Sequence, residues 1–441
     1  MDQHNGGWSP ALSRHDVTVA RVVVLVFLAC IAVVPALEWT SARASEDAGE
    51  TAWSRLTGLG ARVRERLATD AGPGAGLPRR VVVANRAVLE GLADFETALE
   101  DDSRLGRLLR PPAQLVLSGA LGAGNERVYV GRNGWVFYRP DVEYVTGPGF
   151  LDPSALARRV SAASEWTAAP QPDPRPAIIR LARQLEARGV TLVVMPTPLK
   201  PMIHPGQLAS GYGASTAPLQ NPSYAAFVED LTRAGILVFD AADALAGARR
   251  ETGRPQYLAT DTHWRPEAMA RVADALAAFL EARVPMPAID GPAYTRERRE
   301  VTSAGDTVVM LDLPPDQALY PRETVPIERV LLPGGAPWRP SRSADVLLLG
   351  DSFSNIYSLA SLGWGDSAGF AEHLSAALGR PVDRLVQNSD GAFATRLALG
   401  RALASGEDRL AGTRVVIWQF AARELAIGDW RVLDLPEAGT R

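Results

Sequence analysis

Leu347-Leu348-Leu349-Gly350-Asp351-Ser352-Phe353-Ser354 is a hydrophobic run that ends in a glycine turn and a serine. Hydrolytic α/β folds expose a nucleophilic serine in this way, on the turn that follows a buried strand. Val346–Leu349 is therefore a predicted strand and Ser352 the predicted nucleophile, with an ordinary turn serine as the alternative. A second copy of the string, Gly365-Asp366-Ser367, follows Trp364 in a loop and is predicted to cap a helix.

A second motif, Asp261-Thr262-His263-Trp264, precedes this serine in the chain. In an extended segment residues i and i+2 lie on the same side, so the Asp261 carboxylate can bond one imidazole nitrogen of His263. That bond fixes the tautomer and leaves the other nitrogen facing Ser352. The two motifs together predict acyl chemistry through a serine ester. The alternative is a turn aspartate beside a core histidine. Packing is the default role for Trp264, which could also stack on a sugar.

The bulk composition restricts the class of protein. A chain of 441 residues that is 46% hydrophobic can form one or two domains with a sizeable core. A formal net charge of -4 argues against nucleic acid as a partner. The single cysteine, Cys30, excludes a disulfide framework and a cysteine-based zinc site. His204, His263 and His373 follow the first hydrophobic segment without a metal-ligand spacing, so no metal or cofactor is expected, and His204 and His373 are predicted to be structural.

The N-terminal region contains an apolar segment, residues 17–37, about the length that a membrane-spanning helix needs. Arginines lie before and within its first part, whereas acidic residues dominate after it. This asymmetry places residues 1–16 in the cytoplasm and the rest of the chain outside it. The sequence therefore predicts an uncleaved single-pass anchor. A signal peptide cleaved near Ala42-Arg43-Ala44 is the alternative.

Residues 38–125 are predicted to be a helical spacer and residues 126–435 the main domain. The spacer includes a predicted helix over residues 80–109, which Pro111-Pro112 should end. The domain begins with a predicted β-hairpin whose turn is Asn133-Gly134.

Helical and strand patterns alternate through the rest of the domain, from the helix at 177–187 and the strand at 190–195 to a last strand at 415–418. This alternation predicts an α/β fold with a mostly parallel sheet and ligands at the carboxyl ends of its strands. Residues 283–343 are rich in proline and are predicted to be an irregular insertion over the site, with a strand at Val308–Leu313.

These motifs resemble the SGNH-hydrolase superfamily. Gly350-Asp351-Ser352 resembles its first block, and Gly391 falls where its second-block glycine would be. Here the Asp261 and His263 pair precedes the serine, as in a circular permutation, and is spaced Asp-x-His. Both features resemble the alginate O-acetyltransferases of the AlgJ and AlgX type. The similarity extends over residues 80–430 and includes Gly131–Tyr138, Pro196–Lys200, Asp261–Trp264 and Trp418–Glu424.

The resemblance implies an SGNH-hydrolase-like, flavodoxin-like three-layer fold behind an N-terminal inner-membrane anchor, with the catalytic domain in the periplasm. It implies Ser352, His263 and Asp261 as the catalytic residues, which pass an acetyl group through an acetyl-serine onto hydroxyls of a secreted polysaccharide such as alginate. Gly391 would supply an oxyanion donor beside the Ser352 N–H. The usual Gly-x-Asn-Asp block is absent, and Arg423 could serve in its place or pair with a carboxylate.

The same resemblance implies that a membrane-bound O-acyltransferase supplies the acetyl group. Transfer to a sugar requires that water be excluded from the acyl-enzyme, a role open to the 283–343 insertion and to exposed tryptophans. A polysaccharide acetylesterase would use the same residues with water as the acceptor. A noncatalytic glycan-binding scaffold of the export complex is the third alternative.

Overall fold

The computed structural model describes residues 18–28, 32, 36, 52–71, 74–162, 169–213, 216–388 and 391–436. The chain divides into two compact units, Met1–Ala113 and Gln114–Arg441. The predicted cytoplasmic tail lies outside the described residues, as do residues 17, 29–31, 33–35 and 37 of the predicted anchor. Within the part that is described, no helix is both long enough and apolar enough to cross a membrane.

The N-terminal unit contains a helical hairpin. Its first arm comprises α2 (Ala52–Thr57), α3 (Leu59–Arg66) and a π-helical turn, and it packs against the long helix α4 (Leu77–Asp102). Gly91 allows the close approach of the two arms, because a Cβ atom there would lie 2.2 Å from a methyl group of Leu59.

The predicted helix over residues 80–109 is divided in two. The helix α4 ends at Asp102, and α5 (Arg104–Leu121) begins after Ser103, whose Oγ accepts a hydrogen bond from Gly106 N at 3.0 Å. The prediction that Pro111-Pro112 ends the helix was wrong, since both prolines lie inside α5. The break comes earlier because Ser103 leaves the helical conformation (ψ 117°) and caps the next helix.

The C-terminal unit is built on a five-stranded sheet in the order β4-β3-β9-β7-β8, with all neighbouring strands parallel. The strands are β3 (Thr191–Thr197), β4 (Leu237–Val238), β7 (Val346–Gly350), β8 (Asp383–Val386) and β9 (Val415–Ala421). The three central strands are buried almost throughout, as expected when helices cover both faces of a parallel sheet. The predicted α/β fold with a mostly parallel sheet is therefore confirmed.

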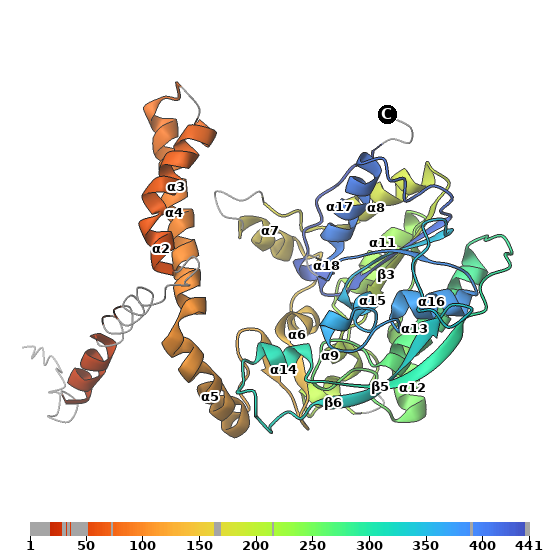
Figure 1. Ribbon diagram of the computed structural model, residues 1–441, viewed down its shortest axis with the longest axis horizontal. Coiled ribbons are helices and arrows are strands. Elements are labelled where there is room, and N and C mark those ends of the chain that lie inside the picture. Colours follow the sequence, from red (N-terminus) through yellow and green to blue (C-terminus); the bar gives the residue numbers. More distant parts are fainter. Residues whose placement is uncertain are drawn as a thin grey trace, which may run out of the picture. The chain divides into compact units, whose positions relative to one another are not determined.

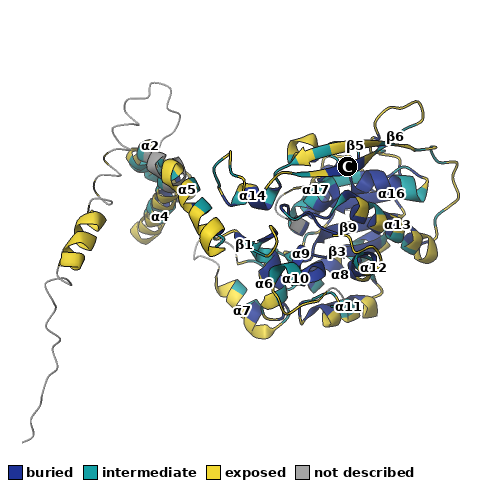
Figure 2. Cartoon of the chain, turned by 90° about the horizontal axis from the view of Figure 1, so that it is seen from below, coloured by how far each residue is buried: buried dark blue, intermediate teal, exposed yellow. Residues whose placement is uncertain are grey.

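Two layers of helices enclose this sheet (Figure 1). One layer consists of α8 (Pro174–Glu186), α11 (Tyr224–Arg233) and α17 (Gly391–Ala404), and the other contains α13 (Pro266–Arg283) and α16 (Phe370–Leu378). Right-handed crossovers put α11 and α17 on one face and α13 and α16 on the other, because the chain moves across the sheet in opposite directions through these two pairs of helices. The helix α8 precedes the first strand of the sheet and packs against α11. Burial is concentrated in the strands and on the inner sides of the helices (Figure 2).

Further helices lie in the connections of the domain. They are α6 (Arg139–Thr146), α7 (Pro153–Ser161), α9 (Lys200–Ile203), α10 (Pro205–Leu208), α12 (Ala242–Thr252), α15 (Ser352–Asn355) and α18 (Glu424–Ile427), with a 3₁₀ turn at Ala360–Leu362. Several of them begin directly after a strand, so their first residues lie at the carboxyl edge of the sheet.

The predicted β-hairpin is present as β1 (Val128–Val130) and β2 (Val136–Tyr138). Asn133 and Gly134 both have positive φ angles, 55° and 78°, and Trp135 N donates to Arg132 O at 3.0 Å across the turn. This is the two-residue turn that an Asn-Gly pair favours. Val136 N also donates to Ala259 O at 3.0 Å, so the hairpin lies beside the segment that leads to Asp261.

The segment over residues 283–343 is more regular than predicted. The strands β5 (Thr295–Ser303) and β6 (Glu323–Leu331) pair antiparallel over their whole length, and α14 (Asp306–Met310) lies in the connection between them. The predicted strand at Val308–Leu313 was wrong, because its first half belongs to this helix. The sequence did not reveal β5 as a strand, because its residues are mostly charged and exposed and do not alternate between apolar and polar. Ion pairs such as Arg296–Glu328, at 3.1 Å, connect it to β6.

The second Gly-Asp-Ser string does not cap a helix as predicted. The helix α16 begins at Phe370 with Gly369 at its N-cap, and Ser367 has a positive φ of 56° in the preceding turn. Asp366 pairs with Arg329 of β6 at 2.8 Å. The copy is thus part of a turn that joins α16 to the β5–β6 pair.

Candidate active site

Ser352 lies at the carboxyl end of a central strand, on the turn between β7 and α15. Asp351 caps this short helix by accepting a hydrogen bond from Phe353 N at 2.9 Å. Gly350 is required at the turn, because a Cβ atom there would lie 2.6 Å from Ser354 Oγ. Ser352 is half-buried and takes the first helical position, where the backbone N–H has no intrahelical acceptor.

A buried amide holds this turn against the neighbouring strands. Gln419 of β9 accepts from Asp351 N at 3.0 Å and from Ser354 Oγ at 2.6 Å. It donates to Asp351 Oδ1 at 2.8 Å and to Thr197 Oγ1 of β3 at 2.8 Å. Asp351 Oδ2 accepts from Ala421 N at 2.7 Å. The carboxyl ends of three strands are thereby joined around the serine, a role for Asp351 and Gln419 that the sequence did not reveal.

The structure brings Ser352, His263 and Asp261 together. His263 Nε2 lies 2.8 Å from Ser352 Oγ, and His263 Nδ1 lies 2.6 Å from Asp261 Oδ1. His263 is 5% exposed and Asp261 is 1% exposed, so both residues are shielded from bulk water. The i, i+2 geometry expected from the sequence is present, since His263 N also donates to Asp261 Oδ1 at 3.0 Å.

The Asp261 carboxylate is fully satisfied by donors. Its second oxygen accepts from Trp364 Nε1 at 2.8 Å and from Asp306 N at 3.0 Å. Burial alone would raise the pKa of Asp261, but the charge of His263 and these hydrogen bonds hold it below its usual value. Burial alone would likewise lower the pKa of His263, yet the charge of Asp261 and its hydrogen bond raise it above the ordinary value. The pair therefore favours an ionised aspartate beside a basic imidazole.

Two further side chains surround the pair, and neither was found from the sequence. Asp306 of α14 lies 3.7 Å from His263 Nδ1. Lys200 is fully buried and donates to the carbonyl oxygens of Val136, Ala259 and Asp261 at 2.6, 3.0 and 2.7 Å. In the sequence, only its place in the Pro196–Lys200 motif pointed to Lys200. Asp306 lies in the segment that was predicted to be irregular.

Trp264 does not face a substrate. It is completely buried, stacks on Phe370 at 5.5 Å and donates from Nε1 to Phe353 O at 3.1 Å. The possible sugar-stacking role was therefore wrong and the packing role is correct. The other described tryptophans of this unit are also buried, so none of these described rings is exposed as a cover for the site. They are Trp135, Trp338, Trp364, Trp418 and Trp430.

Arg423 is held by a carboxylate. Its guanidinium donates to the fully buried Asp141 at 2.8 Å and lies over the rings of Tyr138 and Phe353, at 5.2 and 5.9 Å. Burial alone would lower the pKa of Arg423, but the charge of Asp141 raises it above its usual value. Of the two predicted roles for this arginine, pairing with a carboxylate is the one present. Asp141, in α6, was not identified from the sequence.

Gly391 is the first residue of α17. Residues 389–390, which precede it, lie outside the described part of the chain. Its role as an oxyanion donor stays a prediction.

One compact group of potential metal ligands is present among the described residues. It consists of Asp261, His263 and Asp306, whose nearest ligand atoms lie within 4.8 Å of one another. Because Asp261 and His263 already share a hydrogen bond at 2.6 Å, a cation would have to replace the proton between them. We interpret the group as an acid–base site.

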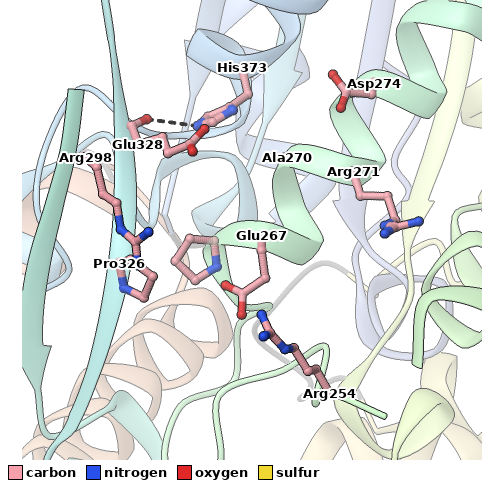
Figure 3. Close-up of a pocket in the computed structure, with 10 residues that line it drawn as sticks. Arg254, Glu267, Ala270, Arg271, Asp274, Arg298, Pro326, Glu328 and His373 are labelled. Atoms are coloured by element: carbon pink, nitrogen blue, oxygen red, sulfur yellow. Dashed lines mark hydrogen bonds between the residues drawn. The ribbon is translucent and has the colours of Figure 1, made fainter. Parts of the chain in front are cut away.

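The two histidines predicted to be structural are buried. His204 Nε2 accepts from Gln256 N at 2.9 Å, and its ring lies 4.8 Å from that of Trp135. His373 Nε2 donates to Glu328 O at 3.0 Å, and the residue lines a cavity of about 510 Å³ (Figure 3). Charged side chains of both signs from α13 and from the β5–β6 pair form the walls of this cavity, and Ser352, His263 and Asp261 do not line it.

Comparison with known proteins identifies the family. The family described as "SGNH hydrolase-like domain, acetyltransferase AlgX" matches residues 128–422. The chain belongs to this family. The described α/β fold with a central parallel sheet is the SGNH-hydrolase-like fold that the family name implies, and the predicted resemblance is confirmed.

Three curated relatives carry the description "Probable alginate O-acetylase AlgJ". The protein from Pseudomonas aeruginosa is 28% identical over 346 residues, which cover 72% of this chain and 77% of the relative. The protein from Pseudomonas fluorescens is 27% identical over 282 residues, which cover 60% of this chain and 66% of the relative. Among solved structures, the O-acetyltransferase domain of Pseudomonas putida AlgJ shares the fold, with 22% identity, a TM-score of 0.51 and coverage of 68% of this chain and 93% of that domain.

Proposed function

We propose that the chain is an O-acetyltransferase that transfers an acetyl group through acetyl-Ser352 onto hydroxyls of a secreted polysaccharide of the alginate type. The observation that carries the proposal is the hydrogen-bonded series from Ser352 Oγ to His263 Nε2 and from His263 Nδ1 to Asp261. Such a series activates a serine by giving its proton an acceptor of fixed tautomer. Membership of an acetyltransferase family and similarity to proteins described as alginate O-acetylases support the substrate class.

In the first half-reaction, His263 Nε2 takes the Ser352 proton as Oγ attacks the acetyl carbonyl carbon. The Ser352 N–H at the start of α15 is the proposed first donor to the developing oxyanion, and Gly391 is the proposed second donor. The donor's leaving group departs with the proton from His263, which leaves acetyl-Ser352.

In the second half-reaction, His263 deprotonates a sugar hydroxyl, whose oxygen attacks the acetyl carbon. Ser352 Oγ leaves and regains its proton from the imidazolium. The acetyl group thus passes to the sugar, and the enzyme returns to its starting state.

The cellular arrangement is part of the proposal. Residues 17–37 would form an inner-membrane anchor, with residues 1–16 in the cytoplasm, residues 38–125 as a spacer and the acetyltransferase domain, residues 126–435, in the periplasm. A membrane-bound O-acyltransferase would pass the acetyl group to Ser352, because acetyl-CoA is not expected outside the cytoplasm. The position of Asp261 and His263 before Ser352 would reflect a circular permutation of the usual motif order. The charge asymmetry around the apolar segment supports the orientation.

A polysaccharide acetylesterase is the second candidate. The half-exposed position of Ser352 favours it, since water could reach an acyl group on this residue. The two functions differ only in the acceptor of the acetyl group.

Incubation with a small acetyl ester and alginate oligosaccharides distinguishes the candidates. Acetylated oligosaccharide that is absent with Ser352→Ala is the expected result. Free acetate as the sole product would contradict acetyl transfer and support the acetylesterase. Neither product from folded protein, together with oligosaccharide binding that survives Ser352→Ala, would favour the noncatalytic scaffold.

A further inference from the structure

The start of α14 binds the backbone that carries Asp261 and His263. Asp306 N donates to Asp261 Oδ2 at 3.0 Å, and Thr262 N donates to Asp306 Oδ1 at 2.7 Å. Thr262 Oγ1 donates to the other Asp306 oxygen, and Thr307 Oγ1 donates to Thr260 O at 2.6 Å. These hydrogen bonds run in both directions, so the two segments fix each other.

The Asp306 carboxylate also faces the imidazole. Its Oδ2 atom lies 3.7 Å from His263 Nδ1, too far for a hydrogen bond but close enough for a direct charge interaction. His263 therefore has two carboxylates on its Nδ1 side, Asp261 in contact and Asp306 behind it. The Asp306 side chain is about one-third exposed, whereas that of Asp261 is buried, so Asp306 lies at the edge of the site.

We propose that Asp306 is a positioning residue for His263, which holds the Asp261–His263 segment by hydrogen bonds and stabilises the imidazolium by its negative charge. The inference rests on the proposed function, because the imidazolium is the form that His263 takes when Ser352 loses its proton. It assigns the segment between β5 and β6 a part in acid–base chemistry as well as in packing.

The charges around this pair support the assignment. Burial and the charge of Asp261 raise the pKa of Asp306 to about 6, so its carboxylate is mostly ionised at neutral pH. The charge of Asp306 in turn acts to raise the pKa of His263, after the larger effects of burial and of Asp261. The other charged groups that act on Asp261, His263 or Asp306, or lie beside them on neighbouring elements, are Lys200, Glu323, Arg265, Asp351, Asp141 and Arg423.

The expected pH dependence follows from the role of His263 as a base. Only the neutral imidazole accepts the Ser352 proton, so turnover rises as pH passes upward through the pKa of His263. Loss of the negative charge at Asp306 lowers that pKa, and the rising limb moves to lower pH. Below pH of about 6 the native Asp306 becomes protonated and the effect of its charge fades.

The test uses the full chain with Asp306→Asn, because asparagine can still accept from Thr262 N. Two quantities are measured: the pH profile of turnover of a small acetyl ester, and the pKa of His263 from NMR of isotope-labelled imidazoles. His263→Gln assigns the NMR signal. We expect the midpoint of the rising limb of the pH profile and the pKa of His263 both to fall by about one pH unit. Asp316→Asn, which removes an exposed carboxylate from the same connection between β5 and β6, should leave both unchanged.

Unchanged midpoints in folded, active Asp306→Asn would overturn the proposal. Uniform loss of turnover at all pH values, with the imidazole titration unmoved, would also overturn it, because the residue would then be structural only. A shifted imidazole titration in a protein that turns over no ester would instead contradict the proposed function and leave the effect of Asp306 on His263 in place.

Discussion

At the scale of single residues, His263 Nε2 is positioned 2.8 Å from Ser352 Oγ and can accept its proton. Asp261 accepts from Nδ1, so the neutral ring carries its proton there and presents a lone pair at Nε2. Trp364 and the Asp306 backbone hold the second oxygen of Asp261 and prevent the carboxylate from rotating away. The residues that hold Asp261 in place therefore also fix the tautomer of His263.

Asp261→Asn should lower turnover of an acetyl ester by about 10³- to 10⁴-fold while the protein stays folded. The amide can donate to Nδ1, which would move the ring proton to Nε2 and remove the acceptor for Ser352. Turnover and thermal unfolding are measured on the same preparation. Turnover within tenfold of the parent would show that Asp261 does not set the tautomer.

At the scale of elements, two structures converge on the site from different parts of the chain. The turn after β7 carries Ser352 and is held by Gln419 of β9. The β5–β6 pair carries α14, which binds the Thr260–Thr262 segment, and Glu323 of β6 accepts from Thr260 N at 2.7 Å. The alignment of serine and histidine therefore depends on the sheet on one side and on the β5–β6 pair on the other.

Gly305, which precedes α14, allows a test of whether the β5–β6 pair and α14 position His263. It has a positive φ of 83°, and a Cβ atom there would lie 2.1 Å from Thr260 O, so Gly305→Ala must displace α14 from the site. We expect a loss of about 1–3 kcal/mol in the free energy of unfolding and a fall in ester turnover of about tenfold or more.

The matched control is Gly334→Ala, on the far side of the β5–β6 pair. Its φ is 89°, but nothing lies within 4 Å of a Cβ atom there, so only the backbone strain is added. This variant should lose stability without losing turnover per folded molecule. Equal turnover in the two variants would mean that α14 does not position His263.

At the scale of the whole molecule, regular patterns were predictable and long-range pairings were not. The alternation of strands and helices, the Asn133-Gly134 turn and the approach of Asp261 to His263 each follow from residues close together in sequence. Asp306 and Asp141 reach the site from distant segments, and no local pattern indicates them. The strand β5 was hidden for a related reason: its charged residues are stabilised by cross-strand partners in β6 that only the fold supplies.

Buried histidines make the stability of the molecule depend on pH. Burial, with a smaller effect of Arg296, lowers the pKa of His373 to about 4, below the 6.5 of an exposed histidine. Between these values the unfolded chain binds a proton that the folded chain excludes, so the free energy of unfolding falls as pH falls from 6.5 toward 4. His373→Gln keeps a donor for Glu328 O and removes the titration.

The variant should therefore lose about 2 kcal/mol less than the parent when urea unfolding at pH 7 is compared with pH 4.5. His204, whose pKa burial also lowers, is present in both proteins and does not affect the difference. Identical losses in the two proteins would show that His373 is not held neutral in the folded state.

The most direct test of the central claim is the intact mass of the protein after brief incubation with an activated acetyl ester. The account predicts a mass increase of one acetyl group on the parent, located at Ser352 by peptide mapping and absent from Ser352→Ala. His263→Ala should form the same adduct far more slowly, because the serine then lacks its proton acceptor. An adduct that persists in Ser352→Ala, or acetyl turnover by that variant at the parental rate, would contradict the account.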